Sequence, residues 1–254
     1  MRKRYFFFDI DQTLGLGITQ EVPESAQYCL DALQKQGHFV AIATGRLQCD
    51  GAQFAEKHSI TSLVADGGNS LTVKGKILEM EGLPLPKARA LLEDAEALHR
   101  PWSVVLDNTM NRYTPYEDYP RSDPRNYMHT VVRPLIINTL GPIYKIMYAT
   151  GAPGEKEVDS QGLIQLPYID GTILVEPADK GLGIEKMMAL LQADPADAVV
   201  FGDGYNDITM FRKPFFAIAM GNARQVIKDH SDYITTNVDE DGILHACQHF
   251  GWVK

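Results

Sequence analysis

Cysteine is scarce in this 254-residue sequence. The three cysteines, Cys29, Cys49 and Cys247, are odd in number and far apart along the chain. They therefore provide neither the framework of a disulfide-stapled domain nor the close spacing of a thiolate metal site. The seven histidines are likewise scattered without ligand spacing. This pattern predicts a protein of a reducing, cytoplasmic compartment.

Long apolar runs and an excess of positive charge are also missing. No stretch approaches the roughly 20 apolar residues of a membrane span, and the basic residues 2–4 meet Asp9 and Asp11 too soon for a signal peptide. The formal net charge of -9 argues against nucleic acid and anionic membranes as main partners. A small anionic ligand is compatible with that charge, because one bound cation can reverse the local sign. Monomer and homodimer both stay open.

The chain does contain a very apolar opening stretch, Tyr-Phe-Phe-Phe at residues 5–8. Four aromatic side chains in a row, without polar alternation, are typical of a strand buried on both faces in the centre of a parallel sheet. Asp9 and Asp11 follow at once, although ionised carboxylates are seldom buried without a partner. Two acids after a strand can simply begin a turn or cap a helix. The alternative is that they hold a cation or a reacting group.

Strands and helices alternate near both ends of the chain, which predicts an α/β fold with a doubly wound, Rossmann-like parallel sheet. Residues 1–81 and 176–254 are expected to form this core. Its expected strands lie at 5–8, 39–43, 62–65, 198–201, 215–219 and 233–235, with a hairpin at 70–78. Its expected helices lie at 23–36, 49–58 and 180–192, then one ending near 229, and a last one at 240–250.

Residues 82–175 differ in texture and are predicted to form an inserted α+β domain. We expect a helix at 84–100 and strands at 102–106, 143–148, 162–166 and 171–176. The strand at 143–148 alternates like a half-exposed antiparallel strand. Residues 111–134 show little periodicity and are expected to be a long functional loop.

Three core strands end in polar clusters. The clusters are Asp9, Asp11 and Thr13; Thr44 and Arg46; and Asp203, Asn206 and Asp207. In an open parallel α/β sheet, ligands bind outside the carboxyl ends of the strands, which lie at one edge. We therefore expect these side chains to converge on one site.

Four converging carboxylates repel one another unless a cation joins them. Hard oxygen ligands without neighbouring His or Cys favour Mg²⁺, which commonly pairs a few carboxylates with a substrate phosphate. Thr13 and Thr44 add hydroxyl groups, and Lys180 begins a helix from which it can supply a positive charge to an anion. This set of groups suits phosphoryl chemistry.

These motifs resemble, in order and spacing, the four motifs of the haloacid dehalogenase superfamily. They are Asp9-Ile10-Asp11-Gln12-Thr13-Leu14, Thr44-Gly45-Arg46, Lys180 and Gly202-Asp203-Gly204-Tyr205-Asn206-Asp207. The large insert between the second and third motifs is similar to the cap domain of the Cof-type phosphatases of that superfamily. The resemblance covers the whole chain.

The resemblance implies a Mg²⁺-dependent phosphatase that hydrolyses a small phosphorylated metabolite, a sugar phosphate or similar phosphomonoester. Asp9 is implied to be the nucleophile that forms an aspartyl-phosphate, and Asp11 the general acid and base. The insert is implied to close over the site and to select the leaving group. The implied metal ligands are Asp9, Asp11 through its backbone carbonyl, Asp203 and Asp207. The groups implied to bind the substrate and its phosphate are Thr44, Gly45, Arg46, Lys180 and Asn206.

Two residues differ from those usual in the family: Gln12 stands where glycine is usual, and Asp66 where asparagine is common. A positive φ at position 12 would strain glutamine by about 1 kcal/mol. Arg46 could contact the substrate or the insert, or form an ordinary ion pair. Six residues of the insert could line a specificity pocket or be solvated loop residues: Arg112, Tyr113, Arg125, Tyr127, His129 and Arg133.

Two other functions are compatible with the sequence. A phosphotransferase or mutase would pass the phosphoryl group of the aspartyl-phosphate to a second sugar hydroxyl instead of water. A non-enzymatic protein would instead sense a phospho-ligand, or act as a receiver-like domain that is phosphorylated on Asp9. The presence of Asp11 argues against the sensor, because a stable phospho-aspartate has no use for an acid and base beside it.

Overall fold

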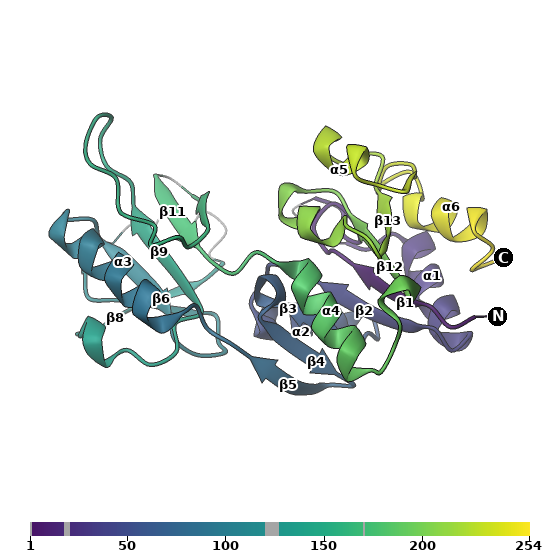
Figure 1. Cartoon of the computed structure of the whole chain (residues 1–254), viewed down its shortest axis with the longest axis horizontal. Helices are drawn as coiled ribbons and strands as arrows, with labels where there is room; N and C mark the ends of the chain where they lie inside the picture. Colours follow the sequence, from purple (N-terminus) through teal and green to yellow (C-terminus); the bar gives the residue numbers. More distant parts are fainter. Residues whose placement is uncertain (1, 18–20, 120–126, 170) are drawn as a thin grey trace. The chain divides into compact units, whose positions relative to one another are not determined.

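The computed structural model describes residues 2–17, 21–119, 127–169 and 171–254. The chain divides into two compact units. The core unit comprises Met1–Arg46, Gly51–Glu79 and Ala178–Lys254, and the cap unit comprises Leu47–Asp50 and Met80–Pro177. Each unit contains its own sheet and its own apolar core (Figure 1).

The core unit is built on a sheet with the strand order β14-β13-β12-β1-β2-β3-β4-β5. The strands from β14 to β3 are parallel, and β4 turns back antiparallel to β3. Their bounds are β1 Tyr5–Phe8, β2 Phe39–Ala43, β3 Leu63–Ala65, β4 Ser70–Val73, β5 Lys76–Met80, β12 Ala198–Gly202, β13 Phe216–Ala219 and β14 Tyr233–Ile234. The carboxyl ends of the parallel strands therefore meet at one edge of this sheet.

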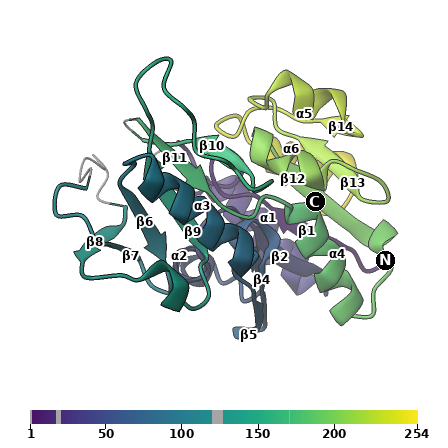
Figure 2. The same ribbon diagram turned by 60° about the vertical axis from the view of Figure 1, so that its left-hand side comes forward.

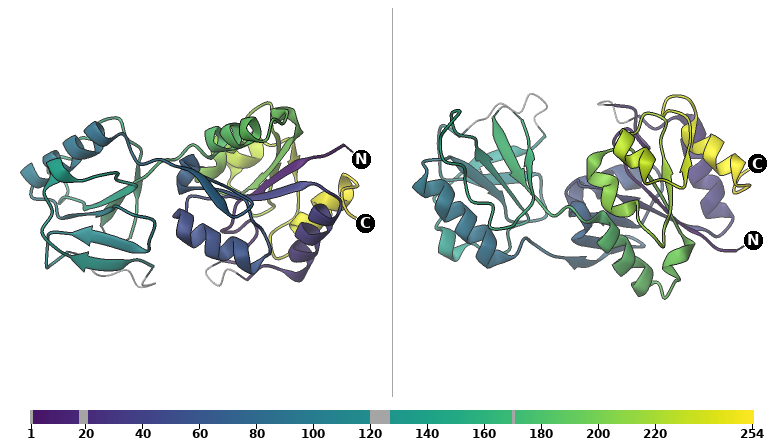
Figure 3. Two further views of the ribbon diagram at one scale, coloured as in Figure 1. Left: turned by 90° about the horizontal axis from the view of Figure 1, so that it is seen from below. Right: turned by 45° about the horizontal axis from the view of Figure 1, so that its top comes forward.

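Helices cover both faces of the core sheet (Figure 3). Their bounds are α1 Glu24–Lys35, α2 Gln48–Lys57, α4 Lys180–Leu190, α5 Gln225–Asp229 and α6 Gly242–His249. Helices α1 and α6 pack against each other on one face, and α4 lies on the opposite face and packs against β3. Within the described ranges, no helix is both long enough and apolar enough to cross a bilayer.

Strand β1 lies in the middle of this sheet, between β12 and β2. Phe6, Phe7 and Phe8 are fully buried, and the ring of Phe8 stacks on Phe201 of β12 at 4.7 Å between centroids. Fully burying a phenylalanine side chain stabilises a fold by about 1.5–3 kcal/mol. The aromatic run thus anchors the strand from which Asp9 emerges.

The cap unit is an α+β layer pair whose sheet has the order β10-β11-β9-β6-β7-β8. Neighbouring strands are antiparallel except β7 and β8, which are parallel. Leu91 and Leu92 of α3 pack in one apolar cluster with Trp102 and Ile146, so α3 covers one face of the sheet (Figure 2). The bounds are α3 Leu85–Ala97, β6 Trp102–Val105, β7 Asn111–Thr114, β8 His129–Val132, β9 Lys145–Ala149, β10 Gln165–Pro167 and β11 Thr172–Val175.

The predicted fold class is confirmed: a mainly parallel α/β core sheet is accompanied by a second, mixed sheet that forms the cap. Two predictions in the insert were wrong. The segment 111–134 is not simply a loop, because it contains the paired strands β7 and β8. Strand β9 is antiparallel to its neighbours as expected, but it is buried over Lys145–Tyr148 rather than half exposed. Lys145 gave this apolar strand the alternating pattern of a solvated face, but its ammonium group is buried and pairs with Glu176.

Candidate active site

The first polar residues after β1, β2 and β12 lie at the same edge of the core sheet, because these strands are parallel neighbours. Asp9 follows β1, Thr44 follows β2 and Asp203 follows β12. Asp9 and Thr44 are buried, and Asp203 is partly exposed. The predicted convergence of these three strand ends is therefore what the structure shows.

A buried lysine joins two of the carboxylates. The ammonium Nζ of Lys180 donates to Oδ1 of Asp9 at 2.7 Å and to Oδ1 of Asp207 at 2.6 Å. The lysine side chain is only 1% exposed. A cation held this tightly between two carboxylates stays charged, because its neighbours compensate for the lost hydration.

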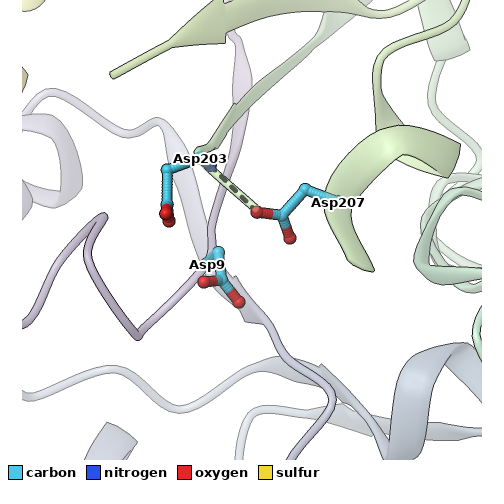
Figure 4. A group of neighbouring side chains, drawn as sticks. All are labelled: Asp9, Asp203 and Asp207. Atoms are coloured by element: carbon cyan, nitrogen blue, oxygen red, sulfur yellow. Dashed lines mark hydrogen bonds between the residues drawn. The ribbon is translucent and has the colours of Figure 1, made fainter. Parts of the chain in front are cut away.

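Backbone and hydroxyl donors fix the two acids of the last motif. Oδ2 of Asp207 accepts from the backbone N–H groups of Asp203 at 2.9 Å and Gly204 at 3.0 Å. The hydroxyl of Thr13 donates to Oδ1 of Asp203 at 2.9 Å. One carboxylate oxygen from each of Asp9, Asp203 and Asp207 lies within 4.8 Å of the other two (Figure 4). We call these three residues the acidic cluster.

The acidic cluster has more negative charge than Lys180 can neutralise. Burial and the neighbouring Asp207 raise the pKa of Asp9, Lys180 opposes both effects, and the net result is a pKa of about 8. Burial and the charge of Asp207 likewise raise the pKa of Asp203 to about 6. Burial alone would lower the pKa of Lys180, but Asp207 and Asp9 outweigh it and hold the pKa above its ordinary value. Three carboxylates around one ammonium group therefore favour the binding of a further cation.

Lys180 reaches the acidic cluster because glycines let the start of α4 approach its neighbours closely. The side chain of Asp179 caps the helix by accepting from the N–H of Leu182 at 2.8 Å. A Cβ atom on Gly181 would lie 2.0 Å from the carbonyl oxygen of Thr209, and one on Gly68 would lie 2.1 Å from that of Asp179. No side chain fits at either position.

We expect Gly181→Ala to lower the free energy of unfolding by about 1–3 kcal/mol, because the added methyl group must displace the Thr209 backbone. Urea unfolding measures the change. Gly141→Ala is the matched control, since a Cβ atom there meets nothing within 4 Å. Equal stabilities of the two variants would contradict the close approach of α4.

Thr44, Gly45 and Arg46 form a loop that is hydrogen-bonded to the turn at Asp66–Gly68. The N–H of Asp66 donates to the carbonyl of Arg46 at 2.8 Å, and the N–H of Gly67 donates to that of Thr44 at 3.2 Å. The hydroxyl oxygen of Thr44 accepts from the N–H of Arg46 at 3.1 Å, which leaves its hydrogen to donate to a ligand. Asp66 has a φ of 50° and is buried in this turn, from which its backbone supports the loop.

The comparison with known families identifies the chain. Residues 6–247 match the model of the haloacid dehalogenase-like hydrolases. The chain belongs to this family. It is 29% identical to YkrA of Bacillus subtilis (strain 168), for which phosphatase activity is proposed, over the full length of both chains.

Two solved structures extend the family likeness to the fold. A crystal structure of a protein from Geobacillus kaustophilus HTA426 has a TM-score of 0.87 and 28% identity, and the match covers 99% of this chain and 100% of that one. The subclass IIB sugar phosphatase BT4131 has a TM-score of 0.78 and 25% identity, again over 99% and 100% of the two chains. This chain is therefore a haloacid dehalogenase-type phosphatase, a phosphoric monoester hydrolase with a cap domain.

The acidic cluster of this phosphatase fits a divalent cation, which the family implies. Its donors are carboxylate oxygens only, and they lie close enough together to share one ion. When all three carboxylates are ionised, they and Lys180 together carry a net charge of about -2. A small divalent ion with oxygen ligands would neutralise that charge.

The fourth predicted acid does not join the acidic cluster with its side chain. The carboxylate of Asp11 is bound by the guanidinium group of Arg46 instead. Arg46 is thus neither a solvated surface residue nor free to point elsewhere. Asn206 is exposed in the short helical turn Tyr205–Met210 that follows β12.

Gln12, which stands where glycine is usual in the family, has a positive φ of 65°. The side chain of Asn222, which follows β13, donates to the carbonyl of Gln12 at 2.9 Å and accepts from the N–H of Val238 at 2.9 Å. Sequence reasoning missed this contact. Its signal was present, since Asn222 follows a fourth strand at the same edge of the sheet.

The two described arginines among the candidate specificity residues of the cap contact other side chains of the cap. Arg112 is buried, donates to Thr130 at 2.8 Å and lies over the ring of Tyr119. Arg133 lies over the ring of Tyr113, with its guanidinium carbon 4.1 Å from the ring centroid. Tyr127 is partly exposed and His129 is exposed. Arg125 lies outside the described residues.

The raised pKa of Asp203 predicts how the stability of the metal-free protein varies with pH. The folded state holds this proton more tightly than the unfolded state, whose ordinary pKa is 3.8. The resulting stability is fully present below about pH 4 and is lost as pH rises through about 6. Asp203→Asn cannot ionise, so it should gain stability over the wild type as pH rises from about 4 to about 6, by up to about 3 kcal/mol above pH 6. Urea unfolding in chelator at pH 4 and pH 7.5 tests this, and a difference that is independent of pH would contradict it.

Proposed function

We propose that this phosphatase hydrolyses a small phosphorylated metabolite, a sugar phosphate or similar monoester, with Mg²⁺ and through an aspartyl-phosphate on Asp9. The observation that carries the proposal is the arrangement around Asp9. Its carboxylate is held by Lys180 and lies within 4.8 Å of the other two acids of the cluster. Such a site attracts a divalent cation and, together with it, a phosphate group.

In the first half of the proposed reaction, a carboxylate oxygen of Asp9 attacks the phosphorus atom. The bond between phosphorus and the leaving oxygen breaks, and Asp11 gives its proton to that oxygen. In the second half, Asp11 takes a proton from water while the water oxygen attacks the phosphorus. The bond to Asp9 then breaks, which returns the free carboxylate and releases inorganic phosphate.

The phosphoryl oxygens are assigned to groups at the same edge of the sheet. The hydroxyl of Thr44 and the ammonium group of Lys180 supply donors, while Gly45 and Asn206 are proposed to contact the phosphate from the adjacent loops. Asp9, the backbone carbonyl of Asp11 and Asp203 would hold Mg²⁺, and Asp207 would support them. When bound, this ion neutralises charge that develops on the transferring phosphoryl group.

Phosphate release from a panel of phosphorylated metabolites tests the function. We expect release that stops in chelator and returns with Mg²⁺, with sugar monophosphates preferred, because BT4131 is a sugar phosphatase. Added alcohols and sugars serve as acceptors in a second series. Transfer to an acceptor in place of water would show a phosphotransferase, and tight binding without any turnover would show a sensor.

A further inference from the structure

The charged pair formed by Arg46 and Asp11 has an unequal environment. Nη2 of Arg46 donates to Oδ1 of Asp11 at 2.6 Å, and Nε donates to Oδ2 at 3.1 Å. The arginine side chain is only 7% exposed, whereas the aspartate side chain is 57% exposed. The buried guanidinium group of Arg46 thus forms a bidentate ion pair with a carboxylate that is largely exposed to solvent.

Arg46 is held in place independently of Asp11. Its backbone N–H donates to the hydroxyl of Thr44, and its carbonyl accepts from the N–H of Asp66. Its guanidinium carbon lies 5.6 Å from the ring centroid of Phe54, which is buried in α2. The guanidinium group is therefore a preorganised anchor.

The side chain of Asp11 is far less enclosed than that of Arg46. Asp11 precedes the strained turn at Gln12, and more than half of its side chain is in solvent. An exposed aspartate samples several χ1 rotamers, and only some of these place its carboxyl group for proton transfer. Two parallel hydrogen bonds fix both the rotamer and the plane of the carboxyl group.

We propose that Arg46 is the positioning residue of this phosphatase for Asp11, setting the orientation in which that carboxyl group transfers protons. The proposal rests on the proposed function, in which Asp11 is the acid and base. It differs from a role of Arg46 in binding substrate, because the guanidinium group acts through Asp11 and not on the phosphate ester.

A double-mutant cycle in kcat separates these roles. The variants are Arg46→Met, Asp11→Asn and their combination, assayed with p-nitrophenyl phosphate and saturating Mg²⁺. We expect Arg46→Met to lower kcat about 10- to 100-fold with an unchanged KM, since acid–base catalysis as a whole contributes about 10²- to 10⁴-fold. In the Asp11→Asn background the same change should leave kcat unaltered, because no acid is left to orient.

Two further variants complete the design. Arg46→Lys keeps the charge but offers no planar fork, so it should recover part of the kcat and also serves if Arg46→Met does not fold. Arg4→Met is the matched control, since Arg4 pairs with Asp197 away from the acidic cluster and should be neutral in kcat. A raised KM at constant kcat, or an equal loss of kcat in the Asp11→Asn background, overturns the proposal. Full turnover by Asp9→Asn would instead overturn the proposed function.

Discussion

Asp9→Asn is expected to abolish phosphate release, lowering kcat at least about 10⁴-fold. An amide nitrogen and oxygen cannot form the aspartyl-phosphate, whatever else the site retains. The fold should survive the change, because the asparagine oxygen can still accept from Lys180 and asparagine has no buried group that ionises. The measurement is the steady-state rate with p-nitrophenyl phosphate and Mg²⁺.

The control for this prediction is the same chemical change at Asp197. That residue pairs with Arg2 and Arg4 just before β12 begins, whereas Asp203 follows the opposite end of β12. Asp197→Asn should therefore keep the turnover of the wild type. Comparable rates for Asp9→Asn and Asp197→Asn would remove Asp9 from the role of nucleophile.

Lys180→Met is expected to produce the largest loss of stability. The variant leaves the buried carboxylates of Asp9 and Asp207 without their shared cation, and breaking a buried ion pair on one side costs about 3–5 kcal/mol. Urea unfolding in chelator measures the loss. Adding Asp207→Asn to the variant should recover part of it, because one unpaired charge is then removed.

Lys213→Met provides the comparison. Lys213 also pairs with an aspartate, Asp232, but its side chain is 76% exposed. Exposed pairs contribute about 0–1 kcal/mol, so this variant should unfold almost like the wild type. If Lys180→Met were no less stable than Lys213→Met, the acidic cluster would not need the lysine for its charge balance.

Much of the core could be predicted from local patterns. The run at Phe6–Phe8 lacks polar alternation because β1 is buried on both faces, and the sequence records that directly. The polar residues after β1, β2 and β12 could be placed together because parallel strands end at one edge. Both inferences use only neighbours in the sequence and one topological rule.

The cap was predicted less well because its strands pair under different rules. Strand β8 pairs in parallel with β7, and neither strand has an alternating pattern. Lys145 looked like a residue of a solvated face, but Glu176 neutralises it inside the unit. Periodicity cannot reveal a buried ion pair between residues far apart in sequence.

Contacts between side chains that are distant in the sequence also could not be predicted. We expected four carboxylates to converge, but the acidic cluster contains three. The side chain of Asp11 pairs with Arg46 instead. In the sequence, the glycines near Lys180 indicate only local flexibility. The structure shows that Gly181 is needed because the backbone of Thr209 lies directly beside it. These features follow from packing in three dimensions, and they are the ones that set the geometry of the acids.

The central claim is that the phosphoryl group passes through Asp9, and rapid quenching tests it most directly. The wild type is mixed with phosphorus-labelled acetyl phosphate and Mg²⁺, quenched in acid within one turnover, digested and mapped by mass spectrometry. We predict an acid-stable, base-labile label on the peptide that contains Asp9, formed and lost at rates that account for turnover and missing in Asp9→Asn. Turnover without a labelled enzyme, or a label on another residue, would contradict the account.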